Sequence, residues 1–156
     1  MRNFWTEFSL ALCARVVVAP SLAFCAAKAD TPLPPPAQVS VMSPSGRIRA
    51  ISDPKTGTRV EDMKRHRVLW SLPDWHRSLF VADDGKHLVT HYNGLNLIPA
   101  DFTDELVLLT FWSEGKKLRG VTVRDFVPEH NMLGHTASHY YWGTVHGIDA
   151  QGRLKG

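Results

Sequence analysis

The sequence predicts an all-β fold, an antiparallel meander of consecutive hairpins of the incomplete-propeller or curved-sheet type. Two observations support this prediction. Runs of alternating polar and apolar residues recur along the chain, as at 47–52 and 117–123, and this period is typical of half-buried strands. Polar turns closed by Gly separate the runs, and the clearest is Asp83-Asp84-Gly85, a strong hairpin signal because Gly supplies positive φ at low cost. One turn every 8–12 residues implies roughly seven to nine short strands.

The N-terminus has the pattern of an export signal. Arg2 and Arg15 precede an apolar run over residues 16–27, and Ala27-Lys28-Ala29 provides small residues at the spacing that signal peptidases cleave. We therefore expect a secretory signal peptide over residues 1–29, with cleavage after Ala29. Arg15 divides the apolar stretch, which is consistent with a long n-region or with a translation start further downstream. An uncleaved, frayed N-terminal helix is the alternative to a signal peptide.

The sequence also contains a candidate site for a lipid anchor, Cys25. The preceding Leu22-Ala23 resembles the start of a lipobox, but Phe24 stands where that motif has a small residue. We do not expect lipidation there.

Removal of the signal changes the charge and the cysteine content. Of 156 residues, 127 remain, and the loss of Arg2, Arg15, Lys28 and Glu7 reduces the net charge from +3 to +1. A nearly neutral domain has little electrostatic attraction for nucleic acid. Both cysteines lie in the signal, so the mature form has no disulfide, and its stability must come from burial. We also expect no stable membrane span in the mature form.

Residues 30–38 read as a Pro-rich linker, and residues 39–156 as a single all-β domain. The run Pro32-Leu33-Pro34-Pro35-Pro36 favours extended polyproline II and makes a semi-rigid spacer. The other interpretation of this run is a ligand for a Pro-recognising module.

The domain is expected to alternate between strands and turns along its length. A short helical turn is expected at 124–128, a loop at 129–137 and a last turn at 149–152, after which 153–156 return along 144–148. The expected β segments are 39–42, 47–52, 58–61, 68–73, 78–82, 86–92, 105–112, 117–123 and 138–148. The segment 105–112 is apolar almost throughout, which predicts burial on both faces.

Two stretches carry a resemblance to known proteins. The run from Ser43 to Gly57 resembles the first hairpin of a blade in secreted propellers of the quinoprotein or lactonase-like kind. A propeller needs at least four four-stranded blades, and the mature chain holds about three at the usual repeat of about 40–45 residues. A closed propeller is therefore not expected.

From Val39 to Leu154 the chain resembles a family of small, exported, uncharacterised bacterial all-β proteins with propeller-blade-like hairpins. The resemblance rests on four stretches, 69–73, 83–85, 92–97 and 138–143. It implies a fold and a compartment, and no activity. Members of that family continue with a further strand after the turn at 149–152, where this chain ends at Gly156.

Late histidines form the weak metal candidates, His135, His139 and His146. On a helix, His135 and His139 would share one face, as in zinc proteases, but the segment is β-prone. On a strand, four residues span about 13 Å, too far for one ion without a second strand. We expect no metal and no cofactor.

Aromatic residues are the better binding candidates: Trp75, Tyr140, Tyr141 and Trp142. Strand alternation puts Tyr140 and Trp142 on one face and Tyr141 on the other. One face is expected in the core, and exposed rings on the other would stack on sugars or contact a partner.

We therefore predict a periplasmic or secreted cell-envelope protein, a non-catalytic binding or structural module. Its expected partner is an envelope protein or a glycan, or a second copy pairing along an open edge near Tyr140–Trp142. The alternative is an envelope hydrolase, metal-assisted through the late histidines, with Asp101, Asp104 and Glu105 as candidate carboxylates. The sequence leans against an enzyme, because it has no Gly-x-Ser-x-Gly elbow and no phosphate-binding loop.

Overall fold

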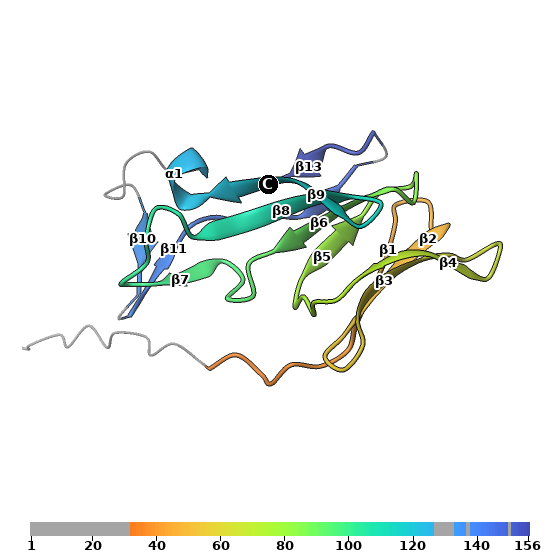
Figure 1. The fold of residues 1–156 in the computed structure, drawn as a ribbon. Helices are drawn as coiled ribbons and strands as arrows, with labels where there is room; N and C mark the ends of the chain where they lie inside the picture. The colour runs from red at the N-terminus through yellow and green to blue at the C-terminus, as the bar shows by residue number, and fades with distance from the viewer. Residues whose placement is uncertain (1–31, 127–132, 137, 150) are drawn as a thin grey trace, which may run out of the picture.

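The computed structural model describes residues 32–126, 133–136, 138–149 and 151–156, and they form an all-β chain of antiparallel sheets (Figure 1). The predicted signal peptide lies outside the described residues. The strands and the one helix of this described part are β1 (Val39–Met42), β2 (Ile48–Asp53), β3 (Gly57–Asp62), β4 (Arg67–Leu72), β5 (Leu79–Val81), β6 (His87–His91), β7 (Leu97–Pro99), β8 (Val107–Ser113), β9 (Lys116–Thr122), α1 (Val123–Phe126), β10 (Gly134–His135), β11 (His139–Tyr141), β12 (Gly147–Ile148) and β13 (Leu154–Lys155).

The first sheet, β1-β2-β3-β4, follows the chain without a crossover. The predicted alternation holds over residues 48–50 and fails at Ile51, which is buried on the same side of the strand as Arg49. Ile48 and Ala50 enter the core, whereas Arg49 is half-buried and places its Nη2 atom 2.6 Å from Glu61 Oε2.

The second sheet has the order β5-β6-β8-β9 and begins with the predicted central hairpin. Gly85 in its turn has φ of 70°, which confirms the expected left-handed position. The turn reaches the first sheet, where the Trp70 indole N–H donates to the Gly85 carbonyl oxygen at 2.8 Å. The hairpin therefore fixes the two sheets relative to each other.

A third sheet, β10-β11-β7, forms from segments far apart in the sequence. β7 lies between β6 and β8 in the chain but pairs with β11, with Ile98 opposite Tyr140. The expectation that Tyr140–Trp142 lie beside an open sheet edge is wrong, because β11 is paired on both sides. The predicted last hairpin is confirmed as β12-β13, with Ile148 opposite Leu154.

The second sheet lies between two apolar cores because its neighbouring residues alternate in direction. Leu88 belongs to the core shared with the first sheet. Val89 belongs to the core shared with the third sheet and the C-terminal hairpin. The predicted meander of consecutive hairpins is confirmed, and none of the sheets closes. The described residues form more strands than expected, because several pairings span only two or three residues.

Candidate functional site

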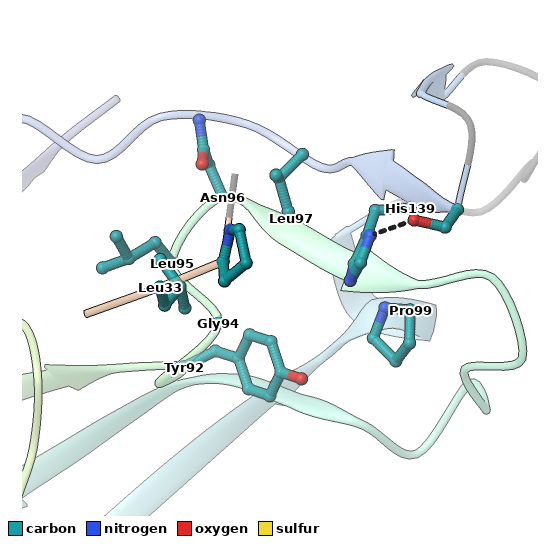
Figure 2. A pocket seen from close by; sticks show the side chains of 10 residues that line it. Leu33, Tyr92, Gly94, Leu95, Asn96, Leu97, Pro99 and His139 are labelled. Carbon is teal, nitrogen blue, oxygen red and sulfur yellow. Dashed lines mark hydrogen bonds between the residues drawn. The ribbon is translucent and has the colours of Figure 1, made fainter. Parts of the chain in front are cut away.

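A groove of about 450 Å³ lies where β7 and the turn before it approach the N-terminal segment (Figure 2). Its lining is mainly apolar, with a few polar groups, among them Asn96 beside Leu95 and His139 beside Pro99. The lining residues are Pro32, Leu33, Tyr92, Gly94, Leu95, Asn96, Leu97, Pro99, Ser138 and His139. A mainly apolar concave surface with a few polar groups is the usual composition of a binding site.

The wall of the groove is a turn held in an unusual backbone conformation. The Leu95 N–H donates to the Tyr92 carbonyl oxygen at 2.9 Å. Leu95 itself has φ of 60°, a left-handed conformation that costs a residue with a Cβ about 1–2 kcal/mol. Asn or Gly would occupy this position at a lower cost. Backbone strain of this kind is concentrated at functional sites. The strained backbone at Leu95 therefore indicates a functional role for its side chain.

Gly94 allows the Tyr92 ring to lie against this turn. A Cβ at Gly94 would overlap the Tyr92 ring carbon Cε1. The ring therefore covers the glycine and forms one side of the groove (Figure 2).

Trp142, a predicted binding residue, is not part of the groove lining but hydrogen-bonds to a wall residue. It is 3% exposed, and its indole N–H donates to the Leu95 carbonyl oxygen at 2.8 Å. Its ring lies 5.0 Å from the His91 ring and 5.3 Å, edge-on, from the Phe126 ring. The hydrogen bond from Trp142 thus helps to hold the strained turn in place.

His91 is buried beside that indole. Its Nδ1 lies 3.1 Å from the Tyr92 carbonyl oxygen. Burial lowers the pKa of the His91 imidazole below its ordinary value, because a charged ring loses hydration in an apolar environment.

Trp75, another predicted binding residue, contacts the N-terminal segment of its own chain. Its indole N–H donates to the Ala37 carbonyl oxygen at 2.9 Å. The Arg77 guanidinium lies 5.1 Å from the centre of the ring, within the range of a cation–π contact.

The two tyrosines of β11 follow the predicted alternation. Tyr140 packs with Trp142 on the core side and meets the Phe102 ring edge-on at 5.6 Å. Tyr141 is 41% exposed on the opposite face, where its hydroxyl hydrogen-bonds with the Thr144 hydroxyl. Tyr141 is thus the most exposed of the four predicted aromatic residues.

The late histidines are dispersed: His135 is in β10, His139 is in β11, and His146 directly precedes β12. His139 lines the groove, with its Nδ1 2.9 Å from the Ser138 hydroxyl oxygen. His135 meets the edge of the Tyr140 ring at 6.2 Å. The backbone N–H of His146 donates to the Lys155 carbonyl oxygen at 2.8 Å. Within the described ranges, no group of three or more His, Cys, Asp or Glu side chains converges.

The candidate carboxylates face a cation. Arg124 lies 3.7 Å from the Asp104 carboxylate and 2.6 Å from that of Glu105. Asp101 is exposed in the same loop. The arrangement is a surface ion pair at the start of α1.

Sequence reasoning did not identify the groove. Residues 92–97 enter the sequence-based predictions only through the resemblance. The available signal was the run Asn93-Gly94-Leu95-Asn96, where an apolar side chain stands inside a turn whose other residues are typical turn formers.

Comparisons of the chain with protein-family models, curated proteins and solved structures found no match. In the part of the chain that the structure describes, no helix has the length and hydropathy to cross a bilayer.

Proposed function

We propose that the chain is an exported, non-catalytic binding module of the cell envelope, periplasmic or secreted, whose groove binds an extended apolar segment of a protein partner. The observation that carries the proposal is Leu95. Its side chain lines the groove from a backbone conformation that disfavours leucine. The signal-like N-terminus supports the compartment.

The lining favours a protein segment over a glycan. Sugars bind to flat aromatic faces flanked by many hydrogen-bonding groups, whereas this groove combines one Tyr ring with Leu and Pro side chains. Leu95, Leu97 and Pro99 supply apolar lining from alternate positions of the chain, which suits the alternate side chains of an extended peptide.

The experiment compares Leu95→Asn with a matched control, Leu118→Asn. Leu118 is 60% exposed on β9 and does not line the groove. Asn tolerates the left-handed conformation, so relief of roughly 1–2 kcal/mol of strain offsets the lost apolar contact. We expect Leu95→Asn to melt at the same temperature as the wild type or higher.

A display library of random nonapeptides supplies the probe. We expect enrichment of apolar peptides whose binding is lost in Leu95→Asn and kept in Leu118→Asn. A glycan array run in parallel tests the other ligand class. Peptides that bind both variants equally, or a glycan that binds in place of any peptide, would contradict the proposal.

A further inference from the structure

We infer that the groove recognises a proline-containing extended segment, and that the chain's own Pro32 and Leu33, which form part of its wall, compete in cis with such a segment until it displaces them. This inference rests on the function proposed above and specifies its ligand and its regulation.

The N-terminal segment already lies at the groove. Pro32 and Leu33 are part of its lining, and Leu33 lies beside Leu95 (Figure 2). Leu33 is still 45% exposed, so it is seated on the rim and is not buried in the core. A contact that leaves almost half of the side chain in water can be exchanged for a similar contact from another chain.

A second contact keeps the segment close. The hydrogen bond from Trp75 to the Ala37 carbonyl oxygen holds the chain just before β1 begins at Val39. Residues 32–38 form no strand, and they run from β1 toward β7 along one side of the molecule (Figure 1). Only five residues separate Leu33 from Val39.

The chemistry of the segment suits the groove. A run of prolines is pre-organised as polyproline II, so it loses little conformational entropy when it binds. Such segments dock into grooves lined by aromatic and apolar side chains. Tyr92, Pro99 and His139 supply rings, and Leu95 and Leu97 supply the apolar wall.

The short connection makes the cis contact an effective competitor. A segment tethered by a few residues acts at an effective concentration on the order of 1 mM. A cis contact with an intrinsic dissociation constant near 100 μM would therefore weaken the binding of any competing peptide about tenfold, relative to a chain without that contact.

The test uses the chain as recovered from expressing cells and a labelled peptide of residues 30–38, Asp-Thr-Pro-Leu-Pro-Pro-Pro-Ala-Gln. Leu33→Asp removes the cis contact at an exposed position, and Leu118→Asp is the matched control for an exposed leucine elsewhere. A peptide with its leucine replaced by aspartate controls for nonspecific binding.

We expect the peptide to bind Leu33→Asp about tenfold more tightly than the wild type or Leu118→Asp, and the control peptide to bind none of them. Adding Leu95→Asn to the Leu33→Asp chain should remove binding. Equal affinity for wild type and Leu33→Asp would overturn the competition in cis. Failure of the peptide to bind Leu33→Asp, while library peptides without proline bind through Leu95, would overturn the ligand class and leave the proposed function standing.

Discussion

Two buried hydroxyl groups join the first sheet to the segment that follows it. The hydroxyl oxygens of Ser52 and Thr58 lie 2.9 Å apart. The backbone N–H of His76 donates to Ser52 Oγ at 2.7 Å. The Thr58 hydroxyl donates to the Asp74 carbonyl oxygen at 2.8 Å. Ser52 and Thr58 are both buried. Their hydroxyl groups therefore satisfy backbone groups of the segment after β4 that would otherwise lack a hydrogen-bond partner.

Ser52→Ala should therefore lower the free energy of unfolding by about 1–3 kcal/mol, because it leaves the His76 N–H without its partner. Ser40→Ala, at an exposed serine on β1 of the same sheet, is the control and should change stability by less than about 0.5 kcal/mol. Urea denaturation of both variants measures the difference. Equal losses would show that the hydroxyl network contributes no stability.

At the scale of elements, the local hairpins were predictable and the third sheet was not. The turns at Gly85 and at 149–152 follow from local chemistry, because Gly and Asp specify their backbone angles wherever they occur. The pairing of β7 with β11 joins residues about 40 positions apart, and no local pattern encodes it. A β-prone run beside a turn looks the same whether it pairs with its sequence neighbour or with a distant strand.

The same distinction applies to the candidate site. Alternation correctly predicted the opposite faces of Tyr140 and Tyr141. It could not show that the Trp142 indole meets the Leu95 carbonyl group, since this contact depends on the third sheet. A leucine at positive φ also contradicts the local preference on which turn prediction relies.

At the scale of the whole molecule, the second sheet is covered by an apolar core on each face, and two histidines, the half-buried His76 and the buried His91, lie beside aromatic rings of these cores. His76 lies 6.4 Å from the Trp112 ring, and His91 lies 5.0 Å from Trp142. Burial lowers the pKa of both imidazoles. The folded chain therefore favours the neutral form of both imidazoles over the protonated form.

This arrangement predicts loss of stability in mild acid. The histidines bind protons less readily in the folded chain than in the unfolded chain, so their contribution is complete above the ordinary pKa of about 6.5 and is lost as the pH falls through the lowered values. Between pH 7.5 and pH 5, the free energy of unfolding should decrease, by at most about 1.4 kcal/mol per pH unit for each histidine. This range lies above the ordinary pKa of carboxylates, about 4, and so isolates the histidines.

Urea denaturation at several pH values, with His91→Gln as the comparison, measures this effect. The variant should be less stable at pH 7.5 and should show a shallower decline toward pH 5. An unfolding free energy that stays constant over this range in the wild type would contradict the account.

The most direct test of the groove is an amide chemical-shift titration by NMR of the isotopically labelled Leu33→Asp chain with the peptide of residues 30–38. The account predicts that the largest shift changes map to residues 92–97 and to His139, which line the groove. The outward face of the first sheet, around Arg49 and Glu61, should remain unchanged. Changes centred on that face, or a spectrum in which the groove residues do not respond, would contradict the claim that this groove is the binding site.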